Sequence, residues 1–116
     1  MPSATATEHL IARYVRSWQE GDLSALRACL ADEIRFDWGI ETYTDPDVFV
    51  AASASGIEWR DVVMLAAMYG ANDASIIYEG VNVTDGVRVR TAEYLVLEGG
   101  VIREAVVVFS EFGDAD

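Results

Sequence analysis

The sequence has few of the residues from which most catalytic and metal-binding motifs are built. It contains one cysteine, Cys29, one histidine, His9, and eight basic residues, all of them arginine. A lone cysteine excludes an internal disulfide and favours a reducing cytoplasm. His9 precedes the apolar stripe of a predicted helix and is expected to be exposed, so neither a histidine-dependent triad nor a zinc site is expected. The absence of a phosphate loop or dinucleotide fingerprint argues against a bound cofactor.

The charge balance is strongly acidic and restricts the partners that the protein can bind. Twenty acidic and eight basic residues give a formal net charge of −12. Nucleic acid and anionic membrane surfaces require a basic patch, so neither is expected as a partner. No apolar run approaches the roughly 20 residues of a membrane span, and the first ten residues do not resemble a signal peptide. A neutral or weakly charged small molecule remains possible.

The first half of the chain has helical periodicity. Ile11, Tyr14, Val15 and Trp18 recur at the spacing of an amphipathic helix, which Gly21 is expected to end. Cys29 falls in the next helical segment and is expected to be a small core residue.

Three more elements are expected before residue 57. Asp22 can cap a second helix over residues 23–33. The segment 34–38 alternates and predicts a strand, and residues 44–56 predict a third helix with Pro46 in its first turn.

The second half is rich in Val, Ile, Tyr and Met, and its segments are separated by turn signals. Short connections predict an antiparallel meander, followed by a flexible acidic tail over residues 111–116. At 116 residues, the whole chain 1–116 is expected to form one α+β domain with its helices on one face of the sheet. The four long strands are expected at about 58–70, 74–83, 87–98 and 101–110.

One carboxylate interrupts an otherwise mostly apolar row in the third of these strands. By alternation, Val89, Glu93 and Leu95 share one face, whereas Tyr94 belongs to the other. Burial of an ionised carboxylate is costly, so Glu93 either faces solvent or is a candidate functional residue with a raised pKa.

The opposite face of the sheet is also apolar. Ala92, Tyr94, Val96, Val106 and Val108 would form a continuous surface across neighbouring strands. Because the helices can cover only one face, we expect this outer face to be buried in a homodimer.

The order of elements and three segments, RYVRSWQEGDLSALRACLADEIRF, GAND and AEYLVLEGGVIREAVVVF, carry a resemblance to a known group of proteins. Over nearly its whole length the chain resembles the nuclear-transport-factor-2-like (NTF2-like) superfamily, and most of all the SnoaL-like polyketide cyclases and ketosteroid isomerases. The resemblance implies a cystatin-like cone, with three N-terminal helices on a curved, mixed but mostly antiparallel sheet in the order α-α-β-α-β-β-β-β.

The same resemblance implies an oxyanion-binding pair. Tyr14 falls on the tyrosine of the isomerases, and Glu93 falls on their carboxylic acid, which is kept neutral by an apolar site. Trp38 stands where the isomerases have their aspartate base. Asp37 is adjacent, but an offset of one residue reverses the face of a strand side chain, so it is only a weak catalytic candidate.

Two functions follow as expectations. The first is an isomerase-type or cyclase-type enzyme acting on a hydrophobic carbonyl compound, with Trp18, Phe36, Trp38, Leu95 and Phe109 around the substrate. The second is a non-catalytic dimer that binds an apolar ligand. A function like that of the limonene-epoxide hydrolases, which use an Asp-Arg-Asp cluster to activate water, is less favoured than either of these. Its Asp-Arg-Asp spacing is not reproduced around residues 88–93.

Overall fold

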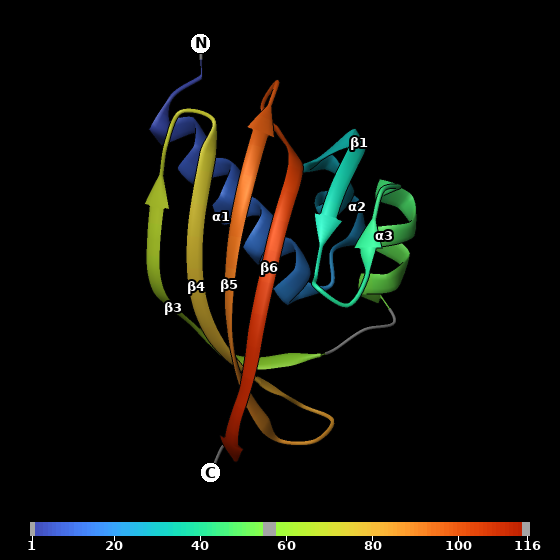
Figure 1. The fold of residues 1–116 in the computed structure, drawn as a ribbon, viewed down its shortest axis with the longest axis vertical. Coiled ribbons are helices and arrows are strands. Elements are labelled where there is room, and N and C mark those ends of the chain that lie inside the picture. Colours follow the sequence, from blue (N-terminus) through green and yellow to red (C-terminus); the bar gives the residue numbers. More distant parts are fainter. Residues whose placement is uncertain (1, 55–57, 115–116) are drawn as a thin grey trace.

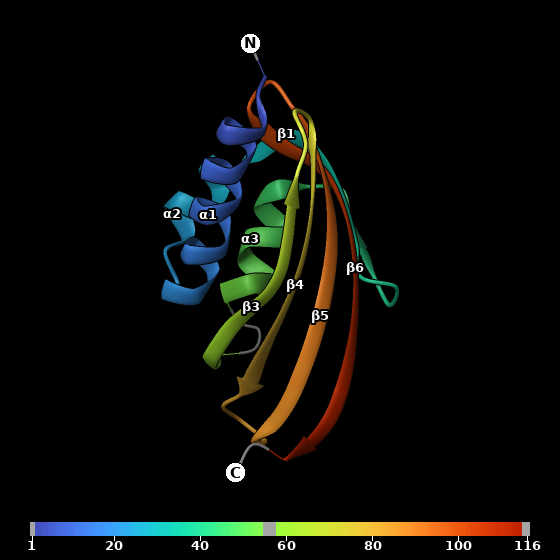
Figure 2. The same cartoon turned by 90° about the vertical axis from the view of Figure 1, so that its left-hand side faces the viewer.

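The computed structural model describes residues 2–54 and 58–114, and within them the helices cover one face of a single curved sheet (Figures 1 and 2). This arrangement confirms the predicted α+β architecture. The elements are α1 (Ala4–Glu20), α2 (Leu23–Ala28), β1 (Leu30–Asp37), β2 (Thr42–Tyr43), α3 (Pro46–Ala54), β3 (Trp59–Tyr69), β4 (Asp73–Asn82), β5 (Val87–Glu98) and β6 (Val101–Asp114).

The sheet is mixed, with one parallel contact. Its strand order is β2-β1-β6-β5-β4-β3. The four long strands form the predicted antiparallel meander, and β1 pairs in parallel with β6. The long strands curve toward the helices in Figure 2, and α1 crosses diagonally behind β4, β5 and β6 in Figure 1. The concave face of the sheet and the helices therefore enclose the core.

Local signals set the ends of the helices. Ser3 accepts a hydrogen bond from the Ala6 backbone N–H at 3.1 Å and caps α1, and Gly21 ends that helix in the left-handed conformation at φ 70°. In α3, Asp45 Oδ1 accepts from the Asp47 N–H at 2.8 Å, while Pro46 occupies the first helical position as predicted. The end predicted for this helix at Gly56 lies outside the described residues.

The second helix is shorter than the sequence indicates. It ends at Ala28 rather than near residue 33, and strand β1 already begins at Leu30. The Cys29 carbonyl accepts from the Ile102 N–H at 2.8 Å, and Leu30 pairs with Ile102. Pairing with β6, distant in sequence, therefore overrides the local helical pattern.

The expected acidic tail is mostly strand. β6 continues to Asp114, and Glu111 lies opposite Val89 on β5. The long β5 partner supplies the hydrogen bonds that a free end would lack. Residues 115–116 lie outside the described part of the chain.

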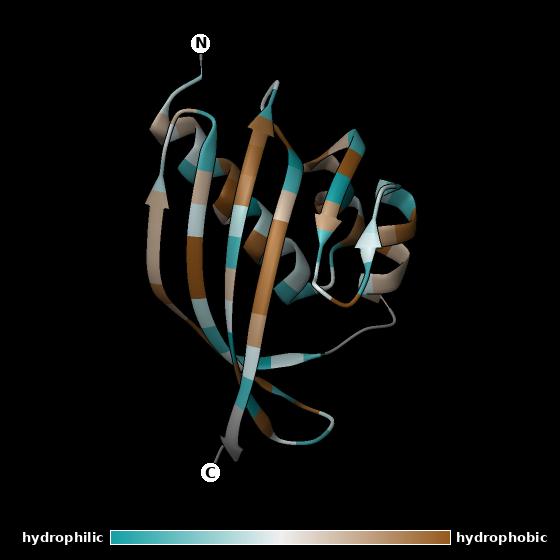
Figure 3. Ribbon diagram, viewed as in Figure 1, coloured by the Kyte–Doolittle hydropathy of each residue, from teal (hydrophilic) through white to brown (hydrophobic). Residues whose placement is uncertain are grey.

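The two faces of the sheet are assigned as the alternation predicted. Val89, Glu93 and Leu95 are buried. On the other face Tyr94 is 45% exposed and Val108 is 60% exposed. Along the apolar stretch of β6, brown in Figure 3, successive side chains thus alternate between the inner and the outer face of the sheet. In the ranges 2–54 and 58–114, no helix is long and apolar enough to cross a membrane.

Candidate functional site

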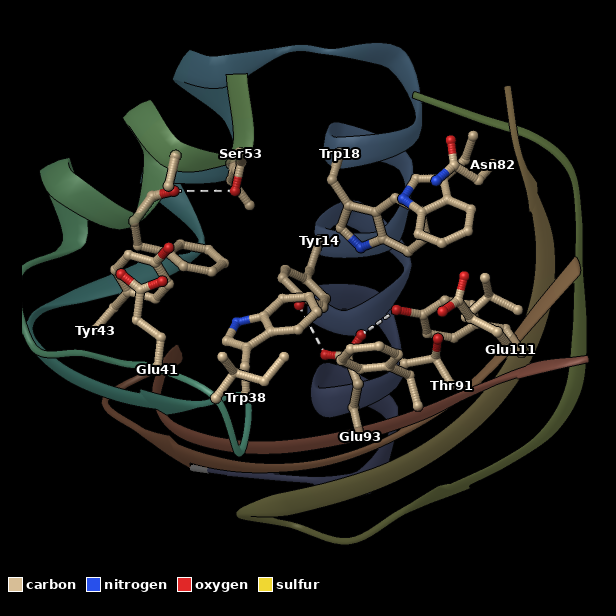
Figure 4. A pocket seen from close by; sticks show the side chains of 18 residues that line it. Tyr14, Trp18, Trp38, Glu41, Tyr43, Ser53, Asn82, Thr91, Glu93 and Glu111 are labelled. Atoms are coloured by element: carbon tan, nitrogen blue, oxygen red, sulfur yellow. Dashed lines mark hydrogen bonds between the residues drawn. The ribbon is translucent and has the colours of Figure 1, made fainter. Parts of the chain in front are cut away.

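A cavity of about 410 Å³ opens between the helices and the concave face of the sheet (Figure 4). Its walls come from α1, α2 and α3, from β3 to β6, and from the segment around β2, so they combine residues from both halves of the chain. The lining residues are Tyr14, Trp18, Leu26, Trp38, Ile40, Glu41, Tyr43, Phe49, Ala52, Ser53, Trp59, Tyr78, Asn82, Val89, Thr91, Glu93, Phe109 and Glu111.

A buried carboxyl group between two tyrosines forms part of the wall. The Tyr14 hydroxyl donates to Glu93 Oε1 at 2.8 Å, and the Tyr78 hydroxyl donates to Glu93 Oε2 at 2.5 Å. Both bonds are drawn as dashed lines in Figure 4. Glu93 is 3% exposed and Tyr14 is 2% exposed, although each contributes to the cavity wall. The resemblance had paired Tyr14 with Glu93, and the structure brings them into direct contact.

The electrostatic balance at Glu93 has two opposing parts. Burial disfavours the charged carboxylate and raises the pKa of Glu93, whereas the hydrogen bonds from Tyr78 and Tyr14 lower it. Burial is the larger effect, so the pKa of Glu93 is raised from its ordinary value. Burial and the adjacent Glu93 carboxylate also raise the pKa of both tyrosines well above the ordinary range. The tyrosines are therefore proton donors at neutral pH.

The number of protons shared by these three groups decides whether they can donate to a ligand. With Glu93 ionised, both tyrosine protons are used in bonds to the carboxylate, and no donor remains. With Glu93 protonated, the group has three O–H protons, one each on Tyr14, Tyr78 and Glu93. Only two of them are needed for the Tyr14–Glu93 and Tyr78–Glu93 hydrogen bonds, so one O–H is left for an acceptor in the cavity. A raised pKa of Glu93 extends the pH range in which this additional donor is present.

The local sequence explains how each member reaches the site. Tyr14 belongs to the buried stripe of α1. On β4 and β5, Ile76 lies opposite Glu93, and Tyr78 lies opposite Thr91 on the same inner face. Tyr78 was not predicted as a site residue. The alternation of Ala74, Ile76 and Tyr78, all buried, is the signal that could have found it.

Aromatic side chains surround the network. Trp18 packs against Tyr78 with ring centroids 5.2 Å apart, and Trp38 meets Phe109 edge-on at 6.4 Å. Trp18, Trp38 and Phe109, three of the residues expected around the substrate, line the cavity. Among the described residues, the indole nitrogens of Trp18 and Trp38 are buried without a hydrogen-bond partner. A ligand oxygen that accepts from either indole would satisfy this donor.

Two residues expected around the substrate do not line the cavity. Phe36 and Leu95 are both fully buried. The Phe36 ring stacks on Phe49 at 4.2 Å, and it is Phe49 that meets the cavity. Phe36 thus supports the wall from behind. Leu95 is two residues beyond Glu93 on the inner face of β5, within the packed core.

Asp37 does not line the cavity either. It lies opposite Val106 in the β1–β6 register, and Val106 is on the exposed outer face of the sheet. Asp37 Oδ1 instead accepts a hydrogen bond from the Gly39 N–H at 2.7 Å. Although β1 contains an irregularity, it falls between Leu30 and Arg35, before this point, so it does not turn Asp37 inward.

Two other carboxylates do reach the cavity. Glu41 follows β1 and Glu111 lies near the end of β6, at opposite sides of the view in Figure 4. Both are exposed at the mouth of the cavity. Neither was predicted from the sequence, because one belongs to a turn and the other was assigned to the acidic tail. Across residues 2–54 and 58–114, no group of three or more His, Cys, Asp or Glu could hold a metal ion.

No protein-family model matches the sequence, and no curated protein sequence matches it. Solved structures do resemble it in shape. A candidate ketosteroid isomerase from Kribbella flavida has a TM-score of 0.86 at 14% identity, covering 98% of this chain and 84% of that chain. An LEH-like epoxide hydrolase from M. tuberculosis has a TM-score of 0.80 at 12% identity, covering 92% and 84%. An NTF-2-like protein of unknown function from Burkholderia xenovorans has a TM-score of 0.82 at 14% identity, covering 97% and 88%.

At these identities the similarity establishes the fold alone. The chain has the NTF2-like fold, a curved α+β cone, as the sequence resemblance predicted. Proteins with this fold serve different functions, so the function of this chain has to be argued from its own cavity.

Proposed function

We propose that this protein is a small-molecule enzyme that acts on a hydrophobic carbonyl compound, polyketide-like or steroid-like in character. The observation that carries the proposal is the buried Tyr14–Glu93–Tyr78 network on the wall of an aromatic cavity. The carbonyl oxygen of the substrate accepts the additional O–H of the protonated network. The apolar remainder of the substrate packs against the tryptophan and phenylalanine side chains.

The network favours reactions in which negative charge develops on the carbonyl oxygen. A donor held in a dry, pre-organised site stabilises such an oxyanion by about 3–4 kcal/mol in other enzymes. Glu93 and both tyrosines are buried and fixed by mutual hydrogen bonds, so little reorganisation is needed when the charge forms. Isomerisation and cyclisation through an enolate are the reaction types that this chemistry supports.

The isomerase and epoxide-hydrolase descriptions belong to structural neighbours. The Tyr14–Glu93 pair supports the carbonyl-polarising half of an isomerase-like site, whereas the two other carboxylates that line the cavity, Glu41 and Glu111, are exposed. In the sequence resemblance Trp38 takes the place of the isomerase base, and in the structure Asp37 lies on the outer face of the sheet. This favours a second candidate function, a binding protein that holds an apolar carbonyl compound without transforming it.

Infrared spectroscopy of a bound aromatic ketone tests the carbonyl contact. Binding to the protonated network should shift the C=O stretch of 2-acetylnaphthalene to lower frequency, and Glu93→Gln should change this shift. The matched control is Glu33→Gln, on the exposed side of β1. A bound ketone with the same C=O stretch in wild type and Glu93→Gln would overturn the proposal.

A turnover screen separates the two candidate functions. Polyketide-like diketones and unsaturated ketones are incubated with wild-type and Glu93→Gln protein, and products are followed by mass spectrometry and NMR. Product formation that requires Glu93 supports the enzyme. Ketone binding to the network with no turnover across the panel supports the binding protein.

A further inference from the structure

The cavity has an unusual charge for a site that takes an apolar ligand. Three of its lining residues are glutamates, Glu41, Glu93 and Glu111, and none of the described residues around it is Arg, Lys or His. The chain as a whole carries a formal charge of −12. Low-dielectric walls focus the field of charges of one sign, so the cavity attracts cations and repels anions.

The two glutamates at the mouth, Glu41 and Glu111, are both exposed. The arginines that form ion pairs nearby are directed to other carboxylates: Arg27 to Asp32 and Asp47, and Arg90 to Glu79. The Glu41 carboxylate accepts a hydrogen bond from the side chain of Tyr43, which also lines the cavity, and the charges of Glu41 and Glu111 both contribute to the negative field of the cavity.

The aromatic walls of the cavity also suit a cationic ligand. Eight of the eighteen lining residues are aromatic, including Trp18, Trp38 and Trp59. The faces of tryptophan rings bind ammonium groups as well as apolar rings. Gly80 lets Trp59 lie close against β4, because a Cβ there would be 3.2 Å from Trp59 Cε3. The cavity thus combines aromatic faces with negative charge at its mouth.

The register of β5 and β6 places the polar groups at two separate positions. Glu93 lies opposite Val107, and Glu111 lies opposite Val89, four residues further along the same ladder. At about 3.3 Å per residue, the two backbone positions are about 13 Å apart. A rigid molecule of two or three fused rings can span from one position toward the other.

We propose that the ligand carries a protonated amine in addition to its carbonyl group. The carbonyl oxygen binds the Tyr14–Glu93–Tyr78 network, as in the function proposed above, on which this inference rests. The ammonium group lies at the mouth, against the aromatic faces and within the negative field of Glu41 and Glu111, which stand on opposite sides of the cavity. The substrate class is therefore an amine-bearing polycyclic or aromatic ketone, and carboxylate-bearing analogues are disfavoured.

Three naphthyl ketones that differ only in charge test this assignment. They are 2-acetylnaphthalenes with an aminomethyl, a hydroxymethyl or a carboxylate group at ring position 6, and their affinities are measured by calorimetry at low and at physiological salt. The cation should bind about tenfold more tightly than the neutral compound, and the anion most weakly. Added salt should reduce the difference.

Substitutions of the two exposed glutamates test whether they cause the preference for the cation. Glu111→Gln and Glu41→Gln should each weaken the preference for the cation over the neutral ketone, and the double variant should abolish this preference. Glu33→Gln is the control. The proposal is overturned if the cation binds no more tightly than the neutral compound, if the double variant keeps the preference, or if none of the three binds. Binding of the neutral ketone that depends on Glu93, without a preference for the cation, would overturn this inference alone and leave the proposed function standing.

Discussion

Tyr14 on α1 and Glu93 on β5 are 79 residues apart in sequence and are joined by a buried hydrogen bond of 2.8 Å. The bond links the first helix to the centre of the sheet, at the wall of the aromatic cavity. Tyr78 completes the arrangement from β4, so both oxygens of the carboxyl group are occupied. The following predictions concern this network, the residues around it and the opposite face of the sheet.

Glu93 should titrate above the ordinary value for a glutamate, because burial outweighs the hydrogen bonds that favour its charged form. The carboxylic-acid band of Glu93 in infrared spectra should persist to higher pH than in a model peptide and should be missing from Glu93→Gln. A titration at the ordinary pKa would remove the basis for the additional donor.

The raised pKa of Glu93 should also make stability depend on pH. Because the folded-state pKa is the higher one, the folded protein binds more protons than the unfolded chain between the two pKa values. The contribution of Glu93 is fully present below the unfolded pKa and is lost as pH rises through the folded one, by about 1.4 kcal/mol for each pH unit that separates the two pKa values. Measured by urea unfolding, the unfolding free energy of the wild type should therefore fall more than that of Glu93→Gln as pH rises through the folded-state pKa of Glu93. Equal pH dependence in both proteins would contradict this.

Tyr78→Phe should raise the pKa of Glu93 further. The substitution removes a donor that lowers this pKa and leaves one carboxyl oxygen without its partner. We expect a loss of about 1–3 kcal/mol in unfolding free energy, measured by urea denaturation at neutral pH. Thr84→Val, in the exposed turn between β4 and β5, is a control that removes another hydroxyl. An unchanged Glu93 titration in Tyr78→Phe would show that the bond is absent in solution.

The outer face of the sheet should form a homodimer, which we propose because Tyr94, Val106 and Val108 are 45%, 52% and 60% exposed in the single chain. Sedimentation should give twice the chain mass of 12.7 kDa. Val106→Arg should yield a monomer, because it places a charge in the centre of this face. Val48→Arg is the matched control, since Val48 is 54% exposed but lies on α3. A wild-type monomer at micromolar concentration would refute the prediction.

Isomerisation of a standard unsaturated ketosteroid should be negligible. Abstraction of a carbon-bound proton needs a base held within hydrogen-bond reach, whereas Trp38 cannot accept a proton and Asp37 faces away. The other two cavity carboxylates, Glu41 and Glu111, are exposed and are not hydrogen-bonded to the Tyr14–Glu93–Tyr78 network. Binding should still occur, and the fluorescence change that reports it should diminish in Trp38→Phe. Asp37→Asn should alter neither binding nor turnover. Efficient turnover abolished by Asp37→Asn would show that β1 has a different register in solution.

Most of the fold was predictable because it follows from local patterns. The stripe of α1, the four long strands and the two faces of β5 agree with the periodicity of the sequence. The predicted element boundaries are wrong where pairing with a strand distant in the sequence determines the local structure. Residues 29–33 have a helical composition, but Leu30 pairs with Ile102 of β6. Residues 111–114 resemble a free tail but belong to β6, which pairs with β5 there.

The sequence by itself determined that Glu93 shares a face with Val89 and Leu95, because a period of two assigns every second side chain of a strand to the same face. That this face is the buried one was decided by the tertiary structure. The sequence also determined, through the helical periodicity of the first segment, that Tyr14 faces the core. Only the tertiary structure decided which other residues line the cavity beside Tyr14 and Glu93. Tyr78, Glu41 and Glu111 join the cavity because strands and turns far apart in the chain curve around one space, and periodicity contains no information about that closure. The distance between Tyr14 and Glu93, and with it the chemistry of the site, depends on how the helix packs against the sheet.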